Sequence, residues 1–183
     1  MRSRVLLDST EFKLTIDRLC YQLIEDLDDP SHSALIGIQP RGVFFAERIY
    51  KRLTEIDRTI SMDFGLLDPT FYRDDFRRRT KPITAKDTKI NFSIEDRNVI
   101  LVDDVFYTGR TIKAAMDALL DFGRPRKVEL MVLIDRRFSR QLPIQPDYIG
   151  KTIDSVSSER VVVEFKEAEG KDTIWIVPEK KTE

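Results

Sequence analysis

Apolar residues recur along the chain with two different periods, and the alternation of the two predicts the fold. Near the N-terminus, apolar side chains stand three or four positions apart, as on one face of an amphipathic helix: Phe12, Ile16, Leu19, Leu23 and Leu27. Asp8 precedes Glu11 by three residues, which is the spacing of a helix-capping pair. We therefore predict a helix that begins just after Asp8.

Short apolar runs, each followed by a loop and a helical pattern, fill much of the remaining chain. Four runs are typical of buried parallel strands: Ser33–Ile38, a stretch near Ile60–Leu66, Asn98–Val102 and Lys127–Asp135. Helical spacing returns over Val43–Leu53 and again at Ile112, Ala115, Met116, Leu119 and Leu120, before Gly123 and Pro125. Strands that alternate with helices predict an α/β fold with a largely parallel central sheet flanked by helices.

Two further segments complete the expected organisation of one domain over residues 1–183. Arg160–Phe165 and Thr173–Val177 alternate in polarity around Gly170, which indicates a C-terminal β-hairpin. Asp68–Arg97 is polar and charged, and its length of about thirty residues is unusual for a plain connection. We expect it to form a lid, a hairpin or a disordered loop.

Composition narrows the class of protein. The chain has 183 residues, and 31 basic against 32 acidic side chains leave a net charge of −1, so no general attraction to nucleic acid or membrane is expected. A single cysteine, Cys20, excludes an internal disulfide and a cysteine-built metal site, and its helical spacing predicts a place in the core. No apolar run suits a signal peptide or a membrane span, so we expect a cytoplasmic protein.

The stretch ILVDDVFYTGRT carries the candidate chemistry. An apolar strand runs directly into Asp103 and Asp104, and in an open parallel sheet ligands bind beyond the carboxyl ends of the strands. The loop that follows leads into a helix N-terminus, whose free N–H groups and dipole suit a phosphate. Gly109 allows close backbone approach, and Thr108 and Thr111 offer hydroxyl groups.

Two carboxylates beside an anion cradle suit a sugar phosphate. The carboxylates can accept hydrogen bonds from a diol or hold a divalent cation, while the loop binds the phosphate. The alternative is a capped helix with two solvated aspartates. The stretch is neither a Walker loop nor a dinucleotide fingerprint, because it lacks the Gly-Lys-Ser/Thr and Gly-x-Gly-x-x-Gly patterns.

Val99–Thr111 resembles the ribose-phosphate-binding signature of the type I phosphoribosyltransferases: four apolar residues, two acids and a loop that ends in T-G-x-T. Other segments match one branch of that family in order, namely LIGIQPRG, FYRDDFRRRT, LIDR and LPIQPDYIGK. This branch comprises pyrimidine-operon attenuation regulators that are also uracil phosphoribosyltransferases. The resemblance thus implies the type I phosphoribosyltransferase fold with a small hood, and the conversion of uracil and phosphoribosyl pyrophosphate (PRPP) to UMP and pyrophosphate.

The resemblance also implies roles for individual residues. Asp103 and Asp104 would bind the ribose hydroxyls and Mg²⁺, the metal bound with PRPP, and together with Arg41 they would be the catalytic residues. The other implied substrate-binding residues are Gln39, Pro40, Gly42, Arg73, Val105, Phe106, Tyr107, Thr108, Gly109, Arg110, Thr111, Asp135 and Arg136. Tyr107 favours uracil, because purine-salvage relatives usually place an aspartate there. The alternative for Gln39–Gly42 is a plain turn with Arg41 exposed.

Some implied features lie in the hood and in the cover of the base. Arg73 and a cluster formed by Arg77, Arg78 and Arg79 would close over PRPP, and Leu142–Lys151 would help to cover the uracil. The only histidine, His32, is expected on the surface, and no single general base stands out. Relatives of this type commonly form dimers or larger homo-oligomers.

The sequence departs from the branch where RNA would bind. The first helix ends in Asp26, Asp28 and Asp29, which would repel phosphates. In the pyrophosphate turn, Gln39 replaces a common lysine. Where RNA would bind, Gln145 stands in place of an expected arginine, although Arg136, Arg137 and Arg140 keep positive charge nearby. We expect RNA binding to be reduced or absent. An RNA-binding attenuator that senses UMP and PRPP, or a salvage enzyme for another base, remain the alternatives.

Overall fold

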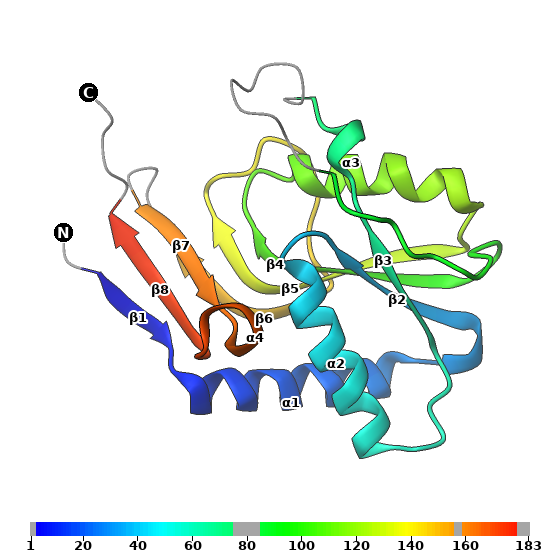
Figure 1. Ribbon diagram of the computed structural model, residues 1–183, viewed down its shortest axis with the longest axis horizontal. Coiled ribbons are helices and arrows are strands. Elements are labelled where there is room, and N and C mark those ends of the chain that lie inside the picture. Colours follow the sequence, from blue (N-terminus) through cyan, green and yellow to red (C-terminus); the bar gives the residue numbers. More distant parts are fainter. Residues whose placement is uncertain (1–2, 75–84, 156–158, 179–183) are drawn as a thin grey trace.

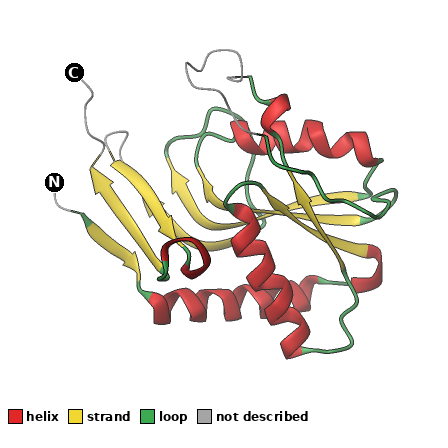
Figure 2. Cartoon of the chain, viewed as in Figure 1, coloured by secondary structure: helices red, strands yellow, loops and turns green. Residues whose placement is uncertain are grey.

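The computed structural model describes residues 3–74, 85–155 and 159–178, which form two β-sheets with helices packed around the larger one (Figures 1 and 2). All five strands of the larger sheet are parallel, in the order β3-β2-β4-β5-β6. They are β2 (Ser33–Ile38), β3 (Asp63–Leu67), β4 (Asn98–Phe106), β5 (Lys127–Arg137) and β6 (Tyr148–Asp154). This confirms the predicted α/β class with a parallel central sheet.

Helices cover both faces of the parallel sheet (Figure 1). One face carries α1 (Ser9–Asp26) and α2 (Gly42–Ile56), and the other carries α3 (Arg110–Leu119). Neighbouring residues of one strand therefore belong to different cores: Ile100 packs with α1 and α2, and Leu101 packs with α3. Because both faces are buried, the strands read as continuous apolar runs.

A smaller antiparallel sheet lies beside the larger one (Figure 2). Its strands are β1 (Arg4–Leu7), β7 (Glu159–Glu164) and β8 (Thr173–Pro178), in the order β1-β8-β7. The predicted C-terminal hairpin is confirmed, and its connection contains the one-turn helix α4 (Lys166–Glu169). The sequence analysis missed β1, whose apolar run of three residues is short, and β6, whose apolar residues are interrupted by polar ones.

The first helix begins as predicted. The Asp8 side chain accepts hydrogen bonds from Thr10 N and Glu11 N, both at 2.9 Å, and the Glu11 side chain accepts one from Asp8 N at 3.0 Å. This capping box satisfies N–H groups that have no partner inside the helix. Elsewhere in the described part of the chain, three short 3₁₀ helices occur, at Pro30–His32, Thr70–Tyr72 and Leu120–Phe122.

Several predicted boundaries and positions were wrong. β3 begins at Asp63 rather than near Ile60, and Leu120 is 56% exposed in a 3₁₀ turn instead of packing on the helix face. β4 continues to Phe106, so the two aspartates lie inside the strand rather than just beyond it. His32 is exposed, as expected. Among the described helices, none is long and apolar enough to cross a membrane.

Cys20 should not react with thiol reagents in the native protein. It is fully buried in the core beneath α2, and burial raises the pKa of its thiol to about 12, so almost no thiolate forms near neutral pH. We expect iodoacetamide to label Cys20 only after unfolding in guanidinium chloride, as read by intact mass. Labelling of the folded protein at the rate of a free cysteine would contradict this placement.

Candidate functional site

The two aspartates of the DD pair lie where the parallel sheet opens. The register between β2 and β4 ends at Gly37 and Val102, whereas β4 stays paired with β5 as far as Phe106 and Asp135. Asp103 and Asp104 are thus held by β5 on one side and lie past the last paired residue of β2 on the other. This is the carboxyl edge at which open α/β sheets bind ligands.

Asp103 and Asp104 lie largely out of solvent, so keeping both carboxyl groups negatively charged costs free energy. Asp103 is 8% exposed; its Oδ1 accepts a hydrogen bond from Asp104 N at 2.9 Å, and Asp104 Oδ1 accepts one from Val105 N at 2.8 Å. Burial raises the pKa of both carboxyl groups. The charge of Asp104 raises the pKa of Asp103 further, whereas Arg41 opposes the rise at Asp104. A ligand that brings hydroxyl donors or a cation would relieve this cost.

Asp103→Asn should therefore stabilise the protein at neutral pH, by about 0.5–2 kcal/mol. The pKa of Asp103 is raised in the folded state, so ionisation costs stability as the pH rises through the folded pKa. Below the unfolded pKa the carboxyl is protonated in both states and this cost is absent. The amide keeps an oxygen that can accept from Asp104 N.

Urea unfolding of both proteins at several values between about pH 4 and about pH 8 would measure this effect. The gain in unfolding free energy should shrink toward the acid end. A gain that does not change with pH, or a loss at neutral pH, would contradict the assigned electrostatic cost.

Arg41 joins the aspartates to the smaller sheet. It precedes α2 directly, and its Nε lies 3.5 Å from Asp104 Oδ2. Its Nη1 lies 2.9 Å from Glu169 Oε1, its Nη2 donates to Val163 O, and its guanidinium carbon is 5.5 Å from the Phe165 ring centroid. The side chain is 36% exposed and makes these contacts, so Arg41 is half-buried rather than fully solvated, and its role in ligand binding stays a prediction.

The turn from Gln39 to Gly42 packs closely on the aspartate strand. Gln39 Nε2 donates to Asp87 O at 2.6 Å, and the Gln39–Pro40 peptide is cis. A Cβ built at Gly42 would lie 2.6 Å from Val102 O and 2.9 Å from Asp103 Cα. Only glycine fits there, because real Cβ atoms do not approach backbone atoms so closely.

Residues 107–109 form a turn that leads into Arg110 and Thr111 at the start of α3. Residues 107–111 border a cavity of about 150 Å³, lined also by Arg73, Asp103, Val105, Phe106 and Ile112. Gly109 has φ +91°, a left-handed conformation that favours glycine, and its carbonyl accepts from Lys113 N at 2.9 Å as α3 begins. Arg73 Nη1 donates to Thr111 Oγ1 at 3.1 Å, which brings the Asp68–Arg97 segment to the loop. Arg110 forms an ion pair with Asp74. The predicted cluster of Arg77, Arg78 and Arg79 lies outside the described residues.

Tyr107 forms the far side of the site. Its ring centroid lies 4.1 Å from the guanidinium carbon of Arg136, which is buried and donates to Ser155 Oγ at 2.8 Å. An adjoining cavity of about 650 Å³ is lined by Tyr107, Thr108, Phe138, Ser139, Arg140, Gln141, Asp154 and Ser155. It is large enough for a nucleobase, and it opens next to the smaller cavity of the loop.

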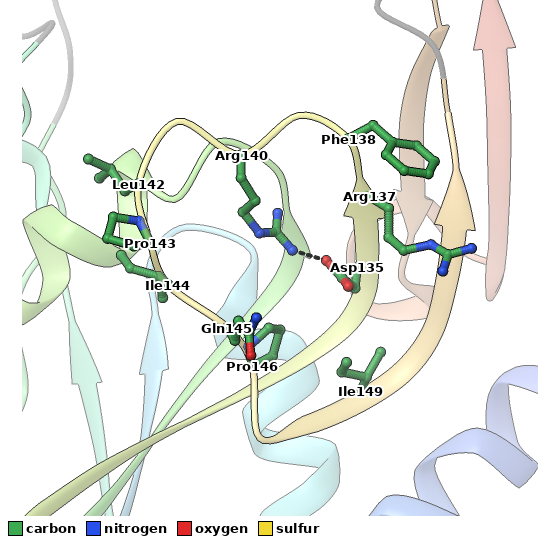
Figure 3. Close-up of a pocket in the computed structure, with 10 residues that line it drawn as sticks. All are labelled: Asp135, Arg137, Phe138, Arg140, Leu142, Pro143, Ile144, Gln145, Pro146 and Ile149. Atoms are coloured by element: carbon green, nitrogen blue, oxygen red, sulfur yellow. Dashed lines mark hydrogen bonds and ion pairs between the residues drawn. The ribbon is translucent and has the colours of Figure 1, made fainter.

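A third cavity, of about 580 Å³, lies between the end of β5 and the connection to β6 (Figure 3). Apolar side chains make up most of its wall: Phe138, Leu142, Pro143, Ile144, Pro146 and Ile149. Asp135 and Arg140 form an ion pair among the residues that line it (Figure 3). Asp135 is thus buried and paired within the protein.

Comparison with known proteins agrees with this geometry. A family model described as a phosphoribosyl transferase domain matches residues 4–169. The chain belongs to the phosphoribosyltransferase family. It is 43% identical over 176 residues to the bifunctional protein PyrR of Enterococcus faecalis, covering 96% of this chain and 97% of that protein. It is also 40% identical over 169 residues to the bifunctional protein PyrR of Deinococcus radiodurans, covering 92% and 91%.

Solved structures share the fold of this phosphoribosyltransferase. A hypoxanthine phosphoribosyltransferase of Staphylococcus aureus aligns with a TM-score of 0.70 at 21% identity, over 98% of this chain and 94% of that chain. The hypoxanthine phosphoribosyltransferase of Trypanosoma cruzi aligns with a TM-score of 0.72 at 16% identity, over 97% of both chains. The resemblance to the type I phosphoribosyltransferases is therefore confirmed in family and fold.

The phosphoribosyltransferase site also contains residues that the sequence analysis did not single out. Glu169 holds Arg41, and Ser155 holds Arg136. Both lie far along the chain from their partners, and neither belongs to the quoted motifs. A carboxylate and a hydroxyl are suitable partners for an arginine, but no local sequence signal marked Glu169 or Ser155 as those partners.

The aspartate pair fits Mg²⁺ as a metal that arrives with its substrate. Mg²⁺ is usually held by one or two carboxylates, with substrate phosphates and water completing the octahedron. Asp103 and Asp104 provide two, and a cation would offset the burial cost of their charges. Within the described residues, no group of three or more metal-binding side chains exists, so a dedicated all-protein metal cage is not present there.

Proposed function

We propose that this phosphoribosyltransferase converts uracil and PRPP to UMP and pyrophosphate. The observation that carries the proposal is the pair of a buried Asp103 and a partly buried Asp104 beside the small cavity bordered by residues 107–111. The carboxylates can accept hydrogen bonds from ribose hydroxyls, and the cavity can receive the 5′-phosphate on backbone N–H groups at the start of α3. We call residues 107–111 the phosphate-binding loop.

In this proposal the chain's own residues act by position and charge. Asp103 and Asp104 hold the ribose and place negative charge beside C1, where positive charge develops as the bond to pyrophosphate breaks. Arg41, 3.5 Å from Asp104, would stabilise the leaving pyrophosphate through its positive charge. When bound, Mg²⁺ would neutralise charge on that leaving group. The Asp68–Arg97 segment, anchored by Arg73 at Thr111, would exclude water from the site.

The base would occupy the larger cavity beside Tyr107. Uracil N1 forms a bond to C1 of the ribose while the C1–O bond to pyrophosphate breaks, and the N1 proton is released. Tyr107, supported by Arg136 at 4.1 Å, offers an aromatic face to a flat ring. A tyrosine instead of the aspartate that is usual in purine-salvage relatives supports a pyrimidine substrate.

Radiolabelled uracil, incubated with the protein, PRPP and Mg²⁺, should yield labelled UMP. Parallel reactions with hypoxanthine and guanine test the choice of base, and we expect both to react much more slowly than uracil. Failure to form UMP while a purine nucleotide accumulates would replace uracil by that purine. Failure with every base, although the protein is folded, would overturn the proposal.

RNA binding is the second candidate function, since close relatives are named bifunctional proteins. We propose that it is weak in this chain, because the arginines that would carry it already have partners. Arg137 pairs with Asp154, Arg140 pairs with Asp135, and Arg136 is buried against Ser155. A gel-shift assay with pyrimidine-operon leader RNA and UMP should show no tight complex. Tight, salt-sensitive binding would establish the regulator instead.

A further inference from the structure

The connection between β5 and β6 packs against the outer side of the phosphate-binding loop. Arg140 lies in this connection, and its Nη1 donates to Tyr107 O at 2.5 Å. Its Nη2 donates to Asp135, and its guanidinium carbon lies 3.5 Å from the ring centroid of Phe106. Figure 3 shows the side chain pointing from the connection back toward Asp135. Arg140 therefore ties the loop to the end of β5.

The next residues of the connection hold the loop as well. Gln141 N donates to Thr108 O at 3.0 Å, and Gln141 Oε1 accepts from Arg110 Nε at 2.6 Å. A Cβ built at Gly109 would lie 3.4 Å from Leu142 Cβ, which is ordinary van der Waals contact. Two consecutive carbonyl groups of the loop, those of Tyr107 and Thr108, thus bind to one neighbouring segment.

Because the peptide group is rigid, holding the carbonyls of Tyr107 and Thr108 also fixes the direction of the N–H groups that follow them. In a trans peptide the C=O and N–H groups point in opposite directions across a rigid plane. The only cis peptide among the described residues is Gln39–Pro40, so the planes after Tyr107 and Thr108 are trans. With both carbonyls held on the outer side, the N–H groups of Thr108 and Gly109 turn toward the opposite side, where these residues line the small cavity.

We infer that Arg140 is a positioning residue, which together with the backbone N–H of Gln141 aims the amides of Thr108 and Gly109 at the 5′-phosphate of the sugar. Arg140 does not touch the 5′-phosphate in this assignment. The planar guanidinium is required because it serves a carbonyl and a carboxylate at once while it stacks on Phe106. The inference rests on the proposed function, since it concerns the same phosphate.

Arg140→Met should weaken the binding of ribose 5-phosphate about tenfold or more, a size typical for removal of a group that orients a ligand-binding group. Titration calorimetry with ribose 5-phosphate measures this directly and needs neither base nor turnover. Pyrophosphate, which would bind on the Arg41 side, should keep its affinity. In the steady state, the KM for PRPP should rise more than kcat falls, because the phosphate does not react.

Two further variants separate positioning from a general loss of structure. Arg140→Lys should recover part of the affinity, since a lysine keeps the charge beside Asp135 but cannot serve both acceptors with one planar fork. Arg137→Met is the matched control, because Arg137 is a neighbouring arginine that pairs with Asp154 and does not contact the loop in any described hydrogen bond. It should bind ribose 5-phosphate like the wild type.

Folded Arg140→Met protein with wild-type affinity for ribose 5-phosphate would overturn the inference. A parallel fall in pyrophosphate affinity would overturn it too, because the effect would then not be confined to the phosphate-binding loop. Wild-type protein that binds no ribose 5-phosphate at all would instead overturn the proposed function, so the two failures are distinguishable.

Discussion

Asp104→Asn should lower kcat/KM for PRPP by about 10²–10³-fold, the loss typical when one electrostatic group of a preorganised site is removed. In the proposed reaction Asp104 accepts a ribose hydroxyl and places negative charge near C1. It also lies 3.5 Å from Arg41, so the substitution leaves that arginine with Glu169 as its remaining acidic partner among the described contacts. The amide can still accept from Val105 N, so the fold should persist.

Asp117→Asn provides the matched control for this experiment. Asp117 is an exposed aspartate on α3 that pairs with Lys113 and lines none of the three cavities of the site. Its substitution should leave kcat/KM unchanged. Circular dichroism and thermal unfolding would verify that both variants are folded. Wild-type turnover by Asp104→Asn would remove this carboxylate from the mechanism.

Gly42→Ala should both destabilise the protein and abolish activity. The new methyl group would lie 2.6 Å from Val102 O and 2.9 Å from Asp103 Cα, so either α2 or the aspartate strand must move. Overpacking of this kind costs about 1–3 kcal/mol, which corresponds to a fall of about 2–4 °C in Tm for each kcal/mol at this chain length. The displaced atoms belong to the site, so we expect activity to be lost even well below the Tm.

Gly123→Ala separates these two effects. Gly123 has φ +132°, a backbone conformation that strains any L side chain, and it follows the C-terminal end of α3, at the opposite end of that helix from the phosphate-binding loop. This variant should lose stability to a comparable degree and keep most of its kcat/KM where it is folded. If Gly42→Ala retained normal activity while folded, the close contact between α2 and β4 would not be needed for the reaction.

Much of the larger sheet could be predicted from local pattern. β2 and β4 are buried on both faces, so their apolar runs were visible without any knowledge of their neighbours. The β1 and β6 strands could not be predicted in this way. In β6 only Tyr148 and Ile153 are buried, and its place depends on pairing with β5. Much of the surface of β6 meets solvent, so it carries no continuous apolar run.

By itself, the sequence determined four of the five strands of the central sheet, the family, and the run of residues that joins the aspartates to the phosphate-binding loop, because these depend on residues adjacent in the chain. Only the tertiary structure decided which side chains hold them. Glu169 binds Arg41 across 128 positions, Arg73 reaches Thr111 across 38, and Arg140 reaches Tyr107 across 33. Such contacts leave no periodic signal, since folding alone brings the partners within hydrogen-bond distance.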